Sequence, residues 1–257
     1  MAGKEYDVAT VSKVIKILEY IKEKDGAYFT QIYTDLGLPK STTYQILSTL
    51  NKHHFVSKSE DGKFDLGIKL FELGFAMSAK LNIRKISNKI LRDLTEKTGL
   101  TAHLSILNEE LQGIYIEKID GAKYLTNMTA IGQKVYMHCS ATGKALLAWQ
   151  SEEVKNQILK NLDYVKFTDN TITDEKALQK ELVLTKKRGF SIENRERENI
   201  ICSVGAPIFD RSGKVVAAIS LGAIVLEFTD EDINLYAGLV KEACRQISEQ
   251  LGIEHRL

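Results

Sequence analysis

Residues 29–55 read FTQIYTDLGLPKSTTYQILSTLNKHHF. The spacing of apolar residues in this stretch predicts a short helix over 31–36 and a second helix over 41–53. Between them, Gly37 suits the left-handed residue that ends a helix, and Pro39 prevents its continuation. The residues expected to cap the two helices are Thr30 and Ser41. This arrangement is a helix-turn-helix, whose second helix fits the major groove of DNA.

A β-hairpin is expected directly after these helices. Residues 55–58 and 64–67 alternate around an Asp-Gly turn, and a helix-turn-helix followed by a hairpin is a winged helix. Segment 37–59 contains three lysines and no acidic residue, so this local surface can meet phosphates. We therefore expect a double-stranded DNA operator as partner, contacted by Thr30, Lys40, Ser41, Thr42, Thr43, Tyr44, Gln45, Ser48, Lys58 and Lys63. Tyr44 is also counted in the apolar stripe of the second helix, with Ile46, Leu47 and Leu50.

The composition is that of a globular chain with room for two domains. Of its 257 residues, 44% are hydrophobic and 27% are charged, with a net charge of +1. Three scattered cysteines form no disulfide framework, which indicates a reducing compartment. Neither a signal-peptide core nor a membrane-length apolar run occurs. We expect a cytoplasmic protein with no membrane partner.

The segment after the hairpin predicts a helix, residues 68–81, that is apolar on more than one face. Such a helix needs a partner, and the same helix of a second subunit is the common solution. The alternative is that it packs on the second domain of its own chain. The expected organisation is a DNA-binding domain over 1–67, a linker and dimerisation helix over 68–82, and a second domain over 83–257.

The second domain is predicted to mix helices with a mostly antiparallel sheet, which is an α+β fold. The expected helices cover 83–97, 140–149, 152–162, 174–188 and 230–251, the last two capped by Thr173 and Thr229. The expected strands cover 101–107, 111–119, 125–131, 190–192, 200–209 and 214–224.

Catalytic and metal-binding signatures are missing from the sequence. Gly143-Lys144 lacks the remainder of a phosphate-binding loop, and no GxGxxG, HExxH or GxSxG motif occurs. The histidines and cysteines show no metal-ligand spacing. Glu196 and Glu198 are interpreted as part of a solvated charged loop. We expect no enzyme activity, no cofactor and no metal. A three-helix interaction module that never touches DNA remains the alternative for the N-terminal segment.

Four segments resemble the IclR family of bacterial transcription regulators. They are LGLPKSTTYQIL (36–47), FDLGIKLFELG (64–74), HCSATGKALLAW (138–149) and CSVGAPIFDRSGKVVAAISLG (202–222). Within the family, KLFELG, GKALLAW and PIFDRSG are most similar to repressors of the ketodeoxygluconate (pectin-breakdown) regulon. The resemblance implies a winged helix, a dimerising linker helix and a GAF-like C-terminal domain, assembled as a homodimer or a dimer of dimers.

The resemblance also implies a function and an effector site. The protein would be a DNA-binding regulator, expected to be a repressor, controlled by a small carboxylate or keto acid, with sugar-acid catabolism as its context. The alternatives are an activator that responds to a different small molecule, and a non-catalytic ligand-binding interaction module. The implied effector residues are Met128, Val135, Tyr136, Ala141, Thr142, Glu193, Asn194, Cys202, Ser220 and Gly222.

Two departures from the family pattern affect these assignments. The run at 199–201 is one residue shorter than in many relatives, which leaves the alignment of Glu193 open by one position. Cys202 can equally be a small buried hydrophobe.

Gln45 stands where relatives often carry Arg. Because Gln pairs with adenine whereas Arg pairs with guanine, we expect an A/T-rich operator where Gln45 points.

Overall fold

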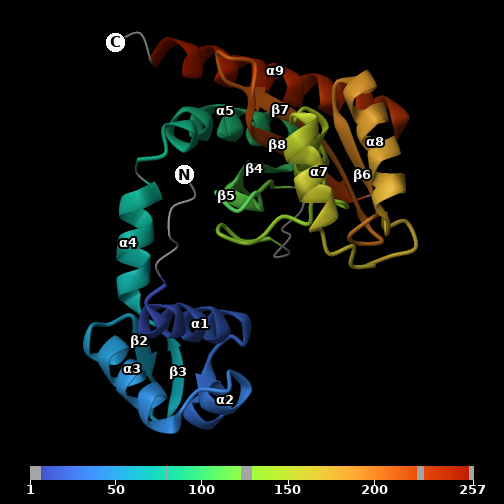
Figure 1. Cartoon of the computed structure of the whole chain (residues 1–257). Coiled ribbons are helices and arrows are strands. Elements are labelled where there is room, and N and C mark those ends of the chain that lie inside the picture. The colour runs from blue at the N-terminus through green and yellow to red at the C-terminus, as the bar shows by residue number, and fades with distance from the viewer. Residues whose placement is uncertain (1–6, 79, 123–128, 225–228, 255–257) are drawn as a thin grey trace, which may run out of the picture. The chain divides into compact units, whose positions relative to one another are not determined.

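The computed structural model describes residues 7–78, 80–122, 129–224 and 229–254, and Figure 1 shows the course of the chain. The chain divides into two compact units, residues 1–80 and 81–257. Each unit has its own hydrophobic core, as expected when a chain of this length folds as two domains.

The N-terminal unit is a helix-turn-helix with a small antiparallel sheet. Its elements are α1 (Ala9–Glu23), β1 (Ala27–Tyr28), α2 (Phe29–Asp35), α3 (Lys40–Lys52), β2 (Val56–Lys58), β3 (Lys63–Leu66) and α4 (Ile68–Ser78). The strand order is β1-β3-β2, and the hairpin of β2 and β3 confirms the predicted wing. Ile17, Ile21, Ile32 and Leu47 form the centre of the core. The sequence reading missed β1, because two residues are too few to show alternation.

The starts of α2 and α3 differ from the predicted caps. Helix α2 begins at Phe29, and the Gln31 side chain accepts a 2.8 Å bond from the Tyr28 N–H, so Thr30 lies inside the first turn. Helix α3 begins at Lys40, directly after Pro39, so Ser41 is not its cap either. Pro39 has an extended backbone, and its carbonyl points into the helix. There the carbonyl accepts a hydrogen bond from the Thr43 N–H.

The linker helix is shorter than expected. Helix α4 covers Ile68–Ser78, and the Lys80 N–H then bonds to the Met77 carbonyl in a turn. Helix α5 begins at Asn82, one residue before the predicted start at residue 83.

The C-terminal unit is built on one antiparallel sheet with the strand order β5-β4-β8-β7-β6. Its strands are β4 (Thr101–Leu107), β5 (Gly113–Ile119), β6 (Ser191–Asn194), β7 (Ile201–Phe209) and β8 (Val215–Ile224). Its helices are α5 (Asn82–Thr98), α6 (Ala141–Ala148), α7 (Glu152–Lys160), α8 (Glu175–Arg188) and α9 (Asp230–Glu254). The predicted α+β class with a mostly antiparallel sheet is confirmed.

Details of this unit confirm some expectations and correct others. The Thr229 hydroxyl accepts a bond from the Asp232 N–H and so caps α9 as predicted. The α8 cap is Asp174, whose carboxylate accepts from Ala177, rather than Thr173, because Asp174 directly precedes the first helical residue. Of the strand expected over 125–131, residues 125–128 lie outside the described residues, and 129–131 form no strand.

Alternation along the central strands separates two cores. On β8, Ala217, Ile219 and Leu221 belong to the core that α5 and α9 cover. Ala218 belongs to the second core, with α6, α7 and α8. Since successive side chains of a strand point to opposite faces, Ser220 lies on the face of Ala218, toward α6.

Candidate functional site

The exposed surface of α3 carries the polar residues expected at DNA. Lys40, Ser41, Gln45 and Ser48 are exposed, as is Thr30 at the start of α2. Tyr44 is 66% exposed, so it belongs to this surface and not to the buried stripe. Its ring meets the edge of Phe29 at 6.2 Å between centroids, an aromatic contact that orients the side chain.

Thr43 does not lie on this surface. Its side chain is fully buried, and its hydroxyl donates a 3.1 Å hydrogen bond to the Pro39 carbonyl. The helical period explains the difference, because residues 43, 46, 47 and 50 share one face of α3. Thr43 therefore stabilises the start of α3 from inside. Its neighbour Thr42 is half-buried.

The two lysines of the wing have different surroundings. Lys58 is exposed, with its ammonium 5.5 Å from the centroid of the Phe64 ring. Lys63 donates a 2.8 Å bond to the carbonyl of Asp25, so it ties the wing to the turn after α1. At the tip, Asp61 accepts a 2.8 Å bond from Tyr28. Of the two, Lys58 is the one placed to meet a phosphate.

A cavity of about 80 Å³ lies in the C-terminal unit, on the α6 face of the sheet. A single water needs roughly 10–15 Å³ of such volume, so the space admits a small molecule. The lining residues come from all five strands of the sheet, the segment before α6, the start of α6 and the loop between β6 and β7. They are Thr101, His103, Tyr115, Thr129, Cys139, Ser140, Ala141, Thr142, Glu193, Arg197, Glu198, Ile201, Ser203, Ser220, Gly222 and Ala223.

Half of the residues implied by the resemblance lie on this cavity. Ala141, Thr142, Glu193, Ser220 and Gly222 line it. The others do not.

Of the remaining five, Val135 packs in the second core, and Tyr136 packs against Phe167 at 4.7 Å between ring centroids. Asn194 accepts a hydrogen bond from the Cys202 thiol at 3.2 Å. Met128 lies outside the described residues. Val135, Tyr136 and Asn194 are therefore not among the residues that line this cavity.

Cys202 misses the cavity by one position. Its neighbours Ile201 and Ser203 line the cavity, and a shift of one residue along a strand moves a side chain to the other face. The shortened run at 199–201 was applied to Glu193, which does line the cavity, and was not extended to Cys202. The sequence reading also missed Arg197 and Glu198, because it treated their segment as a solvated loop.

Burial shifts the pKa values of side chains that line the cavity. Burial raises the pKa of Glu193 to about 7, and the charge of Glu196 adds to this, while a 2.5 Å hydrogen bond from Ser203 opposes it. Burial and Lys118 lower the pKa of His103 to about 4, so its ring is neutral at pH 7. Burial likewise raises the pKa of Cys139 to about 12, which keeps it a thiol. Arg197 supplies a positive charge to the wall.

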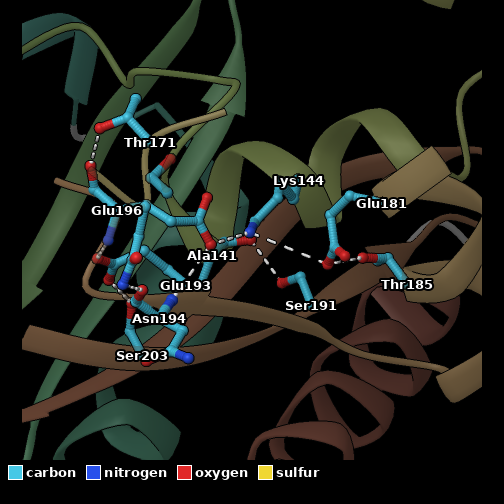
Figure 2. Close-up of polar contacts among 12 residues, drawn as sticks. Ala141, Lys144, Thr171, Glu181, Thr185, Ser191, Glu193, Asn194, Glu196 and Ser203 are labelled. Carbon is cyan, nitrogen blue, oxygen red and sulfur yellow. Dashed lines mark hydrogen bonds and ion pairs between the residues drawn. The ribbon is translucent and has the colours of Figure 1, made fainter. Parts of the chain in front are cut away.

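A buried ion pair lies next to the cavity. Lys144, on α6, is 1% exposed, and its ammonium is 2.6 Å from Glu196 Oε1 (Figure 2). The interpretation of Glu196 as a solvated residue was wrong. Because a buried carboxylate requires a partner, the Lys144 ammonium explains its position.

Metal binding and membrane insertion find no support in the described residues. Across residues 7–78, 80–122, 129–224 and 229–254, no group of three or more His, Cys, Asp or Glu side chains could hold a metal ion. In the same part of the chain, each helix is too short or too polar to span a bilayer.

Comparisons with known proteins agree with this architecture. Residues 10–60 match the family described as IclR helix-turn-helix domain. Residues 75–249 match the family described as bacterial transcriptional regulator IclR C-terminal. The chain belongs to the IclR family. It is a DNA-binding transcriptional regulator with a C-terminal effector-binding domain.

Individual IclR-family proteins are similar over nearly the whole chain. The transcriptional regulator KdgR of Escherichia coli is 32% identical over 246 residues, which cover 95% of this chain and 93% of KdgR. The crystal structure of Thermotoga maritima IclR has a TM-score of 0.74 at 33% identity, covering 95% of this chain and 99% of that one. An IclR homolog from Microbacterium hydrocarbonoxydans, complexed with 4-hydroxybenzoate, has a TM-score of 0.79 at 21% identity, with 94% and 98% covered. Because the curated relatives of this family are named as regulators, the expectation that the chain is not an enzyme is confirmed.

Proposed function

We propose that the protein is a repressor whose affinity for its operator changes when a small hydroxy acid or keto acid, such as a sugar acid, occupies the C-terminal cavity. The observation that carries the proposal is the cavity with a cationic side chain, two carboxyl groups and several hydroxyl groups on its walls. Similarity to KdgR favours a sugar acid, because that relative is a repressor of the ketodeoxygluconate regulon. We propose that this repression takes place in the cytoplasm.

The walls of the cavity offer complementary groups to such an acid. Arg197 attracts a carboxylate, and so do the N–H groups of the first two residues of α6, which lack helical acceptors, whereas the N–H of the third already donates to the Ser140 hydroxyl. Ser203, Ser220 and Thr142 present hydroxyl groups to keto and hydroxyl oxygens. A ligand with one carboxylate and further oxygens therefore finds a partner for each group.

The DNA-binding unit supports a dimeric regulator. The exposed surface of α3 carries only a few basic residues, and phosphate contacts supply most non-specific DNA affinity, so a single copy would bind weakly. Helix α4 exposes Ile68, Phe71, Phe75 and Met77. Pairing of this face with a second copy covers apolar surface and brings two recognition helices to one operator, as a homodimer or within a dimer of dimers.

A ligand screen tests the effector class. Thermal unfolding of the full chain is measured with ketodeoxygluconate, other sugar acids, pyruvate and 4-hydroxybenzoate. A ligand at one hundred times its dissociation constant stabilises the folded state by about 2.7 kcal/mol. A gel shift with DNA upstream of its own gene, with and without the ligand found, then measures the change in operator affinity. Stabilisation by 4-hydroxybenzoate alone would contradict the sugar-acid proposal.

Substitution of Ser220 tests the location of the site. Ser220 is buried on β8 and lines the cavity, so Ser220→Trp fills the space that the effector needs. We expect loss of the ligand-induced thermal shift and unchanged operator binding. Ser212→Trp, in the exposed turn between β7 and β8, is the matched control and keeps the ligand response. A normal ligand response in Ser220→Trp would remove Ser220 from the effector site.

A further inference from the structure

The helix that lines the cavity with its first turn also carries a buried cation. Ala141 and Thr142 of α6 face the cavity, and Lys144 extends from the same helix into the protein interior. Its ammonium lies 2.6 Å from Glu196 Oε1 and 3.9 Å from Glu181 Oε1. We propose that Lys144 is a positioning residue for effector binding, because through Glu196 it fixes the turn that places Arg197 and Glu198 on the cavity wall. The inference rests on the proposed function of the cavity.

Glu196 is the organising residue of the turn between β6 and β7. Its Oε1 accepts both the Lys144 ammonium and the N–H of Asn194, the latter at 3.2 Å. Its carbonyl accepts a 2.5 Å bond from Thr171, and its N–H donates to Glu193 at 3.3 Å. Figure 2 shows these contacts converging on Glu196. The turn is thereby attached to α6, to the segment before α8 and to β6.

The backbone of the turn adopts a conformation that persists only when surrounding contacts stabilise it. Arg195 has a φ of +57°, a left-handed region that residues other than glycine rarely occupy. Its N–H bonds to the Ile201 carbonyl at 2.9 Å, which closes the turn. Such a conformation persists where surrounding contacts determine it. Among the contacts that surround this turn, the Lys144–Glu196 pair is a charged one. Its glutamate directly precedes Arg197 in the sequence.

The charges around Lys144 divide into two pairs. Glu181 receives a 2.6 Å bond from Arg188 on its own helix, so its charge is compensated there. The shorter contact of Lys144 is to Glu196. A buried ion pair stabilises a fold little more than well-packed apolar residues do. A role in holding a specific local geometry therefore accounts better for these two buried charges than stability does.

The pair also connects two walls of the cavity. Lys144 lies one turn after Ala141 on α6, and Glu196 directly precedes Arg197 in the turn. A second contact on the same side, from the Ser191 hydroxyl to the Ala141 carbonyl at 2.6 Å, holds β6 to α6 without reaching the turn. Removal of both buried charges should loosen the turn and leave the sheet in place.

Hydrogen exchange of the full-length protein measures this directly. The double variant Lys144→Met/Glu196→Gln removes both charges and leaves no unpaired buried ion. We expect amides of residues 194–201 to exchange at least tenfold faster than in the wild type, with β4 and β8 unchanged. The matched control is Lys155→Met/Glu152→Gln on α7, an ion pair of 2.5 Å whose glutamate side chain is 76% exposed. The control should exchange like the wild type.

Effector affinity supplies the second readout. With ketodeoxygluconate and pyruvate as probes, the double variant should bind at least tenfold more weakly than the wild type and retain operator binding without ligand. Wild-type protection of residues 194–201 in the double variant would overturn the inference. A uniform rise in exchange over the whole C-terminal unit would overturn it too, because Lys144 would then be a general stability residue. If the wild type binds neither probe, the sugar-acid proposal fails, while the exchange data still decide the role of Lys144.

Discussion

Helix α4 of the N-terminal unit exposes Phe71 and Phe75, which are 67% and 62% accessible, whereas α6 of the C-terminal unit buries the ammonium of Lys144. Each placement is unfavourable unless a partner covers the apolar rings or compensates the charge. For Lys144 the partner is Glu196, within the same unit. For the two phenylalanines, whose rings stack on each other at 5.9 Å, the described residues of α4 show no buried position. The comparison indicates that the apolar face of α4 needs a partner outside the N-terminal unit, which we propose to be a second copy, whereas Lys144 of α6 has its partner within its own unit.

The largest expected effect comes from breaking the apolar surface of α4. Phe71→Glu/Phe75→Glu places two charges where a second copy would pack, so we expect a monomer by light scattering. Operator affinity should fall by about 10²–10⁴-fold, because the second recognition helix no longer binds in the same complex. Val183→Glu/Leu184→Glu on α8 changes two other exposed apolar residues and serves as the control. A dimer that survives the α4 substitutions would show that another surface carries the assembly.

The N-terminal unit was largely predictable because its signals are local. Periodicity and turn residues determine where its helices and wing lie, and the predicted hairpin is present. The errors concern single positions at helix starts. Thr43 was expected at the DNA surface, but it lies three and four residues before Ile46 and Leu47, so the helical period places it on their buried face. Tyr44 was assigned to that face instead, and Tyr44 is exposed.

The cavity was predictable only in part because its walls meet through contacts distant in sequence. Periodicity located β8 and the start of α6, but Ser220 and Thr142, which line the cavity, came from the resemblance to the IclR family. Lys144 and Glu196 lie 52 positions apart, so no local pattern shows that they form a pair. Ser203 and Cys202 differ by one position on β7, which decides the face of the sheet.

The buried carboxyl of Glu193 gives a smaller effect that depends on pH. Its pKa is raised from 4.5 to about 7, so the folded state keeps the proton in a range where the unfolded chain has lost it. The free energy of unfolding therefore falls as pH rises from 4.5 to 7. At about 1.4 kcal/mol per pKa unit, the Glu193 contribution to this fall is roughly 3 kcal/mol.

Denaturant unfolding between pH 4.5 and 7.5 measures that contribution. Glu193→Gln keeps the shape of the side chain and does not titrate, so the fall in unfolding free energy should be smaller than in the wild type by that amount. Glu109→Gln, at an exposed position, should follow the wild-type curve. Equal pH dependence in wild type and Glu193→Gln would show that this carboxyl is ionised throughout the range and is compensated like Glu196.

The smallest effect is expected at the polar surface of α3, where a side chain can change without disturbing a core. Gln45 is exposed, so Gln45→Arg should leave thermal stability unchanged and alter only the base that is read. Binding-site selection should return adenine opposite Gln45 in the wild type and guanine in the variant, since one bidentate contact discriminates by about 1–3 kcal/mol. Thr43→Val, two positions away but buried, should lower stability by about 1 kcal/mol through loss of its bond to Pro39 and leave base preference unchanged. Guanine selected by the wild type would contradict the assignment of Gln45. A change of base preference in Thr43→Val would show that the buried face of α3 sets the position of the exposed one.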